Sequence, residues 1–523
     1  MKTILYTLRA TVITTIILLS VSDAFAQQPS IQYFRSYDKK GIGVFETSKQ
    51  DSVKYDGFKL RIGAGFTQGY QKLKHSNKAK AILADGAATY IETAPGSGSF
   101  VNRVTGAAVP DIVRNPGVFG GYINTTNNKL YSNGNQLYEL SGGFPLAQAN
   151  LNIDVQLAEG VSLNLVSYMS SHHHNEFWVK GGYLKVDEVK FLNSTFFNDL
   201  WKNLTLKVGH MEVNYGDAHF RRSDGGNTFW NPWIENNIMD AFTTEIGAEL
   251  YWQKNGVLLM GGFTDGEIQG NVSKPKDRDP SLYGKAGFDK MFGDARVRLT
   301  ASYMKTKSSV SNTLFGGDRT GSNYQFVMDN TSATVTTAYT SGRFNPGYRD
   351  NLSSFVVNPF IKYKGLEFFG TFERAKGNAA VENGEVQYSN VNNSNLTVFQ
   401  KLNDRKTTQT AAEVLYRFGK NENFYVGARY IKVSSTISLG QSATTTYISQ
   451  GERFPVDISR TSFGGGWFIS DRILLKGEYV RQNYNGFPDA FKNTSTSTAG
   501  YQDSSILAGG KFSGFVIQGS IAF

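Results

Sequence analysis

The last nine residues of the chain, 515–523, read FVIQGSIAF. In an extended strand, alternate residues point to the same face, and one face of this segment carries the apolar side chains of Phe515, Ile517, Ile521 and Phe523. The opposite face includes Gln518 and Ser520. A period of two with one apolar face predicts an extended strand that is buried or lipid-covered on one side only.

The same alternation recurs through most of the chain. It is clear in FKLRIGAGFT (58–67), LNIDVQL (151–157), VRLTASY (297–303) and FYVGARY (424–430). The chain is rich in glycine, with 55 residues, and aromatic residues make up 13% of it. This mixture is typical of many two-faced strands. Turn signals do not recur at the even spacing that a soluble β-sandwich would require.

The spacing between strands predicts the topology. Short polar breaks occur at 158–160, 254–256, 293–294, 364–365, 419–423 and 470–471. Long polar segments lie at 214–241, 267–282, 306–352, 376–408, 434–460 and 483–503. Short periplasmic turns that alternate with long external loops are typical of a transmembrane β-barrel. The barrel must be closed, because lipid cannot form hydrogen bonds with the backbone groups of an open strand edge. We therefore expect an all-β, antiparallel barrel of about 16 strands, or 18 if Gln136–Leu140 and a partner also span.

The N-terminus predicts export. Lys2 and Arg9 provide a positive segment before the mostly apolar run 10–21, and Ala24-Phe25-Ala26 provides a small-x-small cleavage pattern. We expect a signal peptide at 1–26, a periplasmic N-terminal segment at 27–57 and the barrel at 58–523, in the cell outer membrane. A retained N-terminal anchor is the alternative. Segment 27–57 would be a periplasmic tether or would enter the lumen.

A barrel of this size leaves an aqueous channel, and the polar face of the strands should line it. The lumen-facing candidates are Lys59, Arg61, Lys207, Glu245, Glu249, Arg296, Arg298, Lys362, Glu413, Arg417, Arg429 and Lys476. The chain carries a net charge of +10, and basic rings favour anions in pores. A mild anion preference is one hypothesis, and mutual pairing of the wall charges is the other.

The third external loop is the most distinctive stretch, reading NYGDAHFRRSDGGNTFWNPW from 214 to 233. Together with the loop pattern and the final aromatic residue, it makes the chain resemble the Gram-negative outer-membrane porins, general or anion- or phosphate-selective. The resemblance implies a loop that folds inward and narrows the pore, with Asp217, Arg221, Arg222 and Asp224 as constriction candidates. It also implies that Phe515, Ile517, Ile521 and Phe523 form the signal for the barrel-assembly machinery, and that homotrimers are usual. A solvent-facing loop is the alternative.

The sequence thus predicts a porin for passive diffusion of small polar or ionic solutes, in contact with outer-membrane lipid. The alternative is a substrate-specific channel, or a barrel that binds a ligand or partner through large loops such as 306–352. We expect no enzyme and no catalytic residue, because none of the six histidines is paired to a serine. His172–His174 is a loop tip rather than a metal site, no cofactor is expected, and charges that alternate along strands do not fit nucleic acid.

Overall fold

The structure is a computed structural model of the whole chain. It describes residues 28–85, 88–102, 105–115, 121–172, 176–223, 226–266, 279–307, 314–316, 320–348, 350–378, 387–388, 396–397, 403–439, 443–444, 447–448, 452–488, 491–493, 500–502 and 505–523. The expected signal peptide, 1–26, and Asp224 lie outside these residues.

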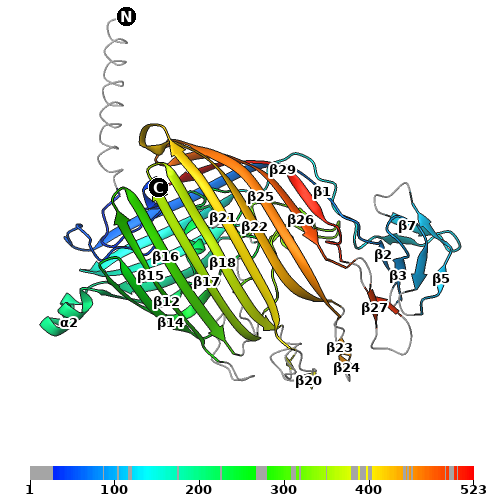
Figure 1. Cartoon of the computed structure of the whole chain (residues 1–523), viewed down its shortest axis with the longest axis horizontal. Coiled ribbons are helices and arrows are strands. Elements are labelled where there is room, and N and C mark those ends of the chain that lie inside the picture. The colour runs from blue at the N-terminus through cyan, green and yellow to red at the C-terminus, as the bar shows by residue number, and fades with distance from the viewer. Residues whose placement is uncertain are drawn as a thin grey trace, which may run out of the picture.

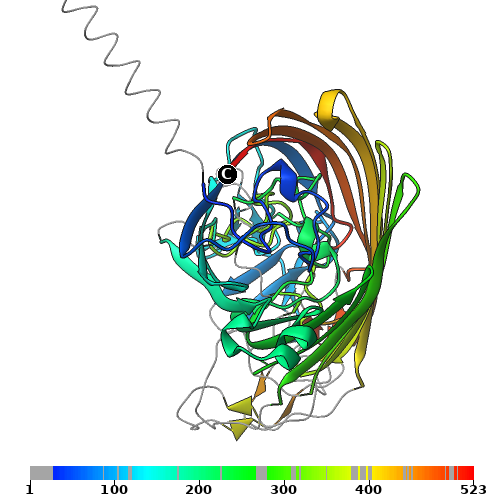
Figure 2. The same cartoon turned by 90° about the vertical axis from the view of Figure 1, so that its left-hand side faces the viewer.

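Sixteen antiparallel strands form one closed barrel (Figures 1 and 2). They are β1 (Lys59–Ser76), β9 (Gln148–Ala158), β10 (Val161–Met169), β11 (Trp178–Val186), β12 (Leu204–Glu212), β13 (Thr244–Lys254), β14 (Val257–Thr264), β15 (Ser281–Phe292), β16 (Ala295–Thr306), β17 (Asp350–Tyr363), β18 (Leu366–Asn378), β21 (Arg405–Phe418), β22 (Phe424–Leu439), β25 (Glu452–Ser470), β26 (Ile473–Asn485) and β29 (Lys511–Ala522). The last strand pairs with the first, from Gly65 opposite Ala522 to Ser76 opposite Lys511. The predicted fold class is confirmed with 16 strands, and Leu137 forms only an isolated bridge to Asn330.

The outer face of the barrel is apolar. On the final strand, Phe515, Ile517, Ile521 and Phe523 are 61%, 50%, 46% and 42% exposed, so this set points outward. Leucine, isoleucine, valine and aromatic side chains continue the exposed belt around the other strands. A contiguous apolar surface of this size is stable in lipid rather than in water. The protein therefore spans the outer membrane, where closed barrels satisfy every strand edge.

One end of the barrel carries short turns and the other carries long loops, so we assign the former to the periplasmic side. An aromatic stack marks the periplasmic rim, where the rings of Tyr416, Phe418, Phe424 and Trp467 follow one another at 5.7–6.0 Å. The longest periplasmic turn holds α2 (Thr195–Trp201), which projects from the barrel (Figure 1). Within the described residues, no helix is long and apolar enough to cross a membrane.

The first external loop, 77–147, builds a small β-structure of its own beside the barrel mouth (Figure 1). Four strands form one sheet: β2 (Ile82–Asp85), β3 (Ala88–Glu92), β4 (Phe100–Asn102) and β5 (Ala108–Val109). Three more form a second: β6 (Ile112–Arg114), β7 (Gly121–Asn124) and β8 (Leu130–Ser132). Leu83, Phe100, Ile112 and Tyr131 form their shared apolar core.

Candidate functional site

The third external loop, 213–243, crosses the lumen instead of facing solvent. Its atoms bond to wall side chains on β1, β15, β16, β17, β18, β21, β22, β25, β26 and β29. In Figure 2 this green segment and the blue N-terminal segment lie within the ring of strands. At the closest approach, a Cβ on Gly226 would lie 2.2 Å from the carbonyl oxygen of Gly65 on β1, so the loop backbone rests directly on the wall.

Asp217 anchors the start of this loop in an ion cluster with Glu46, Lys285 and Arg298. The Arg298 guanidinium donates to both Asp217 oxygens at 2.8 and 2.9 Å, and the Lys285 ammonium lies 2.6 Å from Oδ1. The same two bases contact Glu46 at 2.6 and 2.8 Å. All four side chains are buried. Burial alone would raise the pKa of Glu46, but the charges of Lys285 and Arg298 hold that pKa well below its ordinary value.

The two arginines of the loop are engaged with carboxylates. Arg221 lies 2.8 Å from Glu367 and 3.5 Å from Glu413, and its guanidinium covers the ring of Phe369 at 4.8 Å. Arg222 pairs with Asp240 of the same loop at 2.6 Å. Both are almost fully buried. The structure thus brings Asp217, Arg221 and Arg222 into the lumen, but each has a partner of opposite charge.

The far side of the loop is held mainly through its backbone. Lys476 on β26 donates to the carbonyl oxygens of residues 228, 231 and 233 at 2.8–3.0 Å. Arg460 on β25 donates to the carbonyl oxygen of residue 236 at 2.7 Å, and Arg429 on β22 to that of residue 235 at 2.8 Å. Glu478 accepts from the backbone N–H of residue 234 at 2.7 Å. Buried charges that bond to fixed dipoles are satisfied without a mobile counter-ion.

The N-terminal segment, 28–57, lies across the periplasmic end of the lumen. Of the two expectations for this segment, the structure shows insertion into the lumen. Tyr37 donates to Asp154 on β9 at 2.9 Å, and Lys49 donates to backbone oxygens of the β11–β12 turn and β12 at 2.5 and 2.6 Å. On the opposite side, Lys39 reaches the turn at residues 421 and 423, at 2.7 and 3.0 Å.

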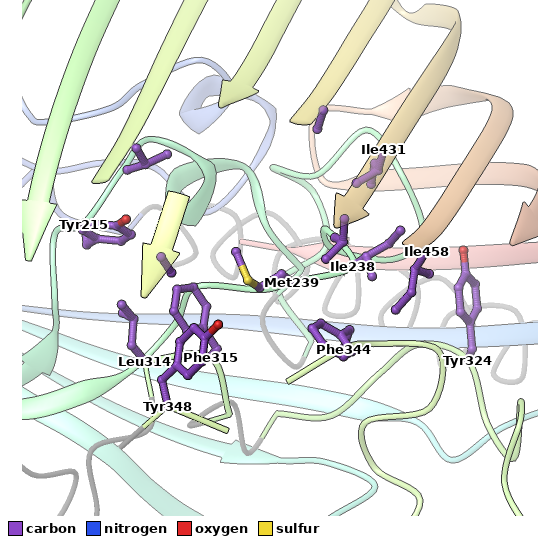
Figure 3. Close-up of a cluster of buried hydrophobic side chains, with 14 of the residues drawn as sticks. Tyr215, Ile238, Met239, Leu314, Phe315, Tyr324, Phe344, Tyr348, Ile431 and Ile458 are labelled. Atoms are coloured by element: carbon purple, nitrogen blue, oxygen red, sulfur yellow. The ribbon is translucent and has the colours of Figure 1, made fainter. Parts of the chain in front are cut away.

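The external half of the lumen is filled by a large apolar cluster (Figure 3). Loop residues Ile238, Met239, Phe315 and Phe344 contribute to it. They meet wall residues of β22 and β25, including Ile431, which is fully buried. The described parts of the loop between β16 and β17, 314–316 and 320–348, thereby pack on the third loop, and Arg343 joins the two loops through Glu235 at 2.8 Å.

The wall candidates lie on the lumen side, and most of them form ion pairs: Lys59 with Asp56 (2.7 Å), Arg296 with Asp289 (2.6 Å), Arg298 with Asp217, Lys362 with Glu422 (2.7 Å), Glu413 with Arg221, Arg417 with Glu367 (2.9 Å) and Arg429 with Glu478 (3.5 Å). Four others form hydrogen bonds: Lys207 to Tyr251 (3.2 Å), Glu245 from Thr264, Glu249 from the backbone of Asn214 (2.8 Å) and Lys476 to the loop backbone. Arg61 covers the ring of Phe34 at 4.7 Å.

Two residues that organise this site, Glu46 and Arg460, were not selected from the sequence. Glu46 lies in a segment without strand periodicity, so its pairing with Lys285 gave no sequence signal. Arg460 lies on the polar face of an alternating strand, and that parity was the signal that could have identified it, as it identified the interior-facing acidic positions Glu367 and Glu478. Across the described residues, no group of three or more His, Asp or Glu side chains is placed to hold a metal ion.

No family model and no curated protein matches the chain. Solved structures align along most of its length. OmpT of Vibrio cholerae is 9% identical, with 90% of this chain and 99% of that chain covered and a TM-score of 0.40. An anion-selective porin from Comamonas acidovorans is 10% identical, with 89% and 100% covered and a TM-score of 0.41. The outer-membrane channel DcaP of Acinetobacter baumannii is 9% identical, with 90% and 99% covered and a TM-score of 0.37.

With identities this low and TM-scores below 0.5, these likenesses carry no argument about what the chain does. The barrel rests on its own strand pairing and apolar belt. Its chemistry depends on the lumen, where the wall carries fixed charges. The N-terminal segment, the third loop and the loop between β16 and β17 are inserted there and bond to most of those charges. Such an arrangement can admit a solute only where an inserted segment moves or leaves a cavity.

Proposed function

We propose that this protein is an outer-membrane channel for small polar or ionic solutes, and that it is selective and closed at rest. The observation that carries the proposal is the third loop, which crosses the lumen and bonds to the wall on both sides. A polar lumen within a lipid-spanning barrel supports a path for solutes. Passage then requires the loop to leave at least some of its wall contacts.

A selective channel agrees better with this geometry than a general diffusion porin. An open pore would present its wall charges to water, whereas Asp217, Arg221 and Lys476 are taken up by internal contacts. The apolar cluster of the external half also disfavours a permanently hydrated path, because apolar constrictions expel water. The alternative of a substrate-specific channel is therefore the one we propose.

We also propose a mild anion preference. The chain has a net charge of +10, and lumen bases outnumber the acidic wall groups selected from the sequence. Arg221 and Arg222 are neutralised by neighbouring carboxylates, so they are poor sources of this selectivity. The preference would come from basic groups that retain free donors near the periplasmic mouth.

Because the sequence contains no cysteine, a disulfide introduced by two substitutions would be the only one in the protein, and it can be used to test the proposal. The hydroxyls of Thr228 on the third loop and Ser520 on β29 form a hydrogen bond, so Thr228→Cys with Ser520→Cys can pin the loop to the wall. Single-channel currents are recorded in a planar bilayer under a salt gradient, before and after oxidation. We expect intermittent openings that disappear on oxidation and return on reduction.

A second cysteine pair provides the matched control. Ser281 and Thr306 lie on adjacent wall strands with their hydroxyls 2.6 Å apart, so a disulfide there crosses no part of the lumen. Oxidation of this pair should leave the current unchanged. Steady, large openings that ignore the loop disulfide would refute closure by the third loop. A reduced, folded barrel without any current would refute the channel itself, and a reversal potential of the opposite sign would refute the anion preference.

A further inference from the structure

A cavity of about 260 Å³ lies inside the lumen, between the N-terminal segment and the third loop. Three parts of the chain enclose it: the N-terminal segment, the third loop and the wall strands β9–β13. Its lining combines aromatic rings with charged and amide side chains, among them Arg35, Tyr37, Asn164, Lys207 and Trp230. A concave space with aromatic walls and a few convergent polar groups is the usual form of a small-molecule site. We call it the N-terminal cavity.

The carboxylates of the N-terminal cavity are already engaged. Asp154 accepts from Tyr37 at 2.9 Å and from Asn164 at 2.6 Å. Glu46 belongs to the ion cluster with Lys285 and Arg298. Glu212 pairs with His219 at 3.0 Å. Because each carboxylate has donors of its own, none of them is available as the main partner of a bound cation.

Two of the bases that line the cavity, Arg35 and Lys207, are less fully engaged than its carboxylates. Within the part of the chain that the structure describes, the Arg35 guanidinium donates to two backbone oxygens, those of residues 41 and 220, at 3.2 and 2.8 Å. Among the described residues, no carboxylate lies at ion-pair distance from its guanidinium. Lys207 is 23% exposed within the lumen, and its nearest carboxylate, Glu249, is 3.9 Å away. Burial lowers the pKa of Arg35 to about 9, so this group is still charged at neutral pH.

Aromatic rings lie beside these two bases. The Arg35 guanidinium covers the indole of Trp230 at 3.6 Å, and that indole stacks on Tyr37 with ring centroids 6.2 Å apart. The Lys207 ammonium lies 5.3 Å from the ring centre of Tyr183. Such contacts fix the positions of the cations without neutralising them. The cavity thus presents fixed positive charge next to flat apolar surfaces.

We propose that the N-terminal cavity binds a small organic carboxylate, with Arg35 and Lys207 as its anion-binding residues and Trp230, Tyr37 and Tyr183 around its apolar body. A planar guanidinium matches a carboxylate in geometry as well as in charge. The inference deepens the proposed function and rests on it for the route by which a ligand reaches the cavity. It makes the N-terminal segment part of the binding site, since Arg35 belongs to that segment.

Calorimetric titration of the detergent-solubilised full-length mature protein tests the inference, with benzoate as the probe and benzamide as its neutral analogue. We expect benzoate to bind and benzamide to bind at least about tenfold more weakly. Arg35→Gln and Lys207→Gln should each weaken benzoate binding by about 10- to 100-fold, because each removes a charged hydrogen-bond donor. Lys40→Gln is the matched control, since Lys40 is an exposed base of the same segment that does not line the cavity.

Two further measurements separate binding from folding. Hydrogen exchange of residues 28–57 reports whether the N-terminal segment stays in place in Arg35→Gln. If it does not, Lys207→Gln decides the outcome, because Lys207 belongs to the wall. Arg35→Lys keeps the charge and should recover part of the affinity. Equal binding of benzoate and benzamide, or wild-type affinity in both Gln variants, would overturn the proposal. Binding needs no current, so its failure is distinguishable from failure of the channel.

Discussion

Neutralising Asp217 should release the third loop from the wall. This carboxylate is fully buried and accepts hydrogen bonds from Arg298 at 2.8 and 2.9 Å and from Thr300 at 2.8 Å, with Lys285 at 2.6 Å. In Asp217→Asn, Glu46 would remain in contact with both bases, and Asp289 with Arg298 alone. Removing one partner of a buried ion pair costs about 3–5 kcal/mol, because the opposite charge stays buried. We expect a cost of this order for the docked state of the loop.

Such a cost raises the equilibrium constant for loop opening by roughly two to four orders of magnitude. Hydrogen exchange of amides in 213–223 and 226–243 measures that constant, and single-channel recording should show a higher open probability. Asp289→Asn is the matched control: Asp289 contacts the same Arg298 at 3.4 Å but does not touch the loop. Exchange rates and open probability in Asp217→Asn that equal those of Asp289→Asn would refute the view that this ion cluster holds the loop closed.

Three further outcomes are expected. Gly226→Ala should displace the third loop from β1, because its Cβ would lie 2.2 Å from the Gly65 carbonyl oxygen, and loop amides should exchange faster with little change in barrel stability. Phe515→Arg places a charge on the lipid face and should lower the free energy of unfolding in bilayers by up to about 2–4 kcal/mol, measured by urea titration. Burial raises the pKa of Asp329 to about 6. Because the pKa in the folded state lies above its ordinary value, protonated Asp329 stabilises the folded state at low pH, and this contribution is lost as the pH rises through about 6. Amides of 320–348 should therefore be better protected at pH 5 than at pH 7.5 after correction for intrinsic exchange, and Asp329→Asn should remove this difference.

The strands could be predicted because membrane strands carry their own local signal. A lipid-facing side chain at every second position produces the alternation of segments such as 58–67 and 515–523, and it is independent of which strand lies beside them. The loop lengths then gave the strand count and the side of each turn. The short strands of the first external loop, such as Ala108–Val109, were missed because two to five residues are too few to show a period.

The contents of the lumen could be predicted only in part. The resemblance to porins implied an inward third loop, but the partners of Asp217 and Arg221 depend on pairings between residues far apart in the chain. The rule that the inner face is polar also fails along part of β22 and β25. Ile431 and Ile458 face inward there and are fully buried, because inserted loops cover them with apolar side chains. A strand cannot show from its own sequence whether water or a loop will lie beside it.

The position of the N-terminal segment constrains the order of assembly. The cylinder closes where β29, the final strand, pairs with β1, and the segment before β1 already lies inside that cylinder. Either residues 28–57 are enclosed at the moment the seam forms, or they thread through a finished mouth afterwards. In the first case, residues 28–57 would template the curvature of strands made after them, and the final seam would close only around a correctly filled interior.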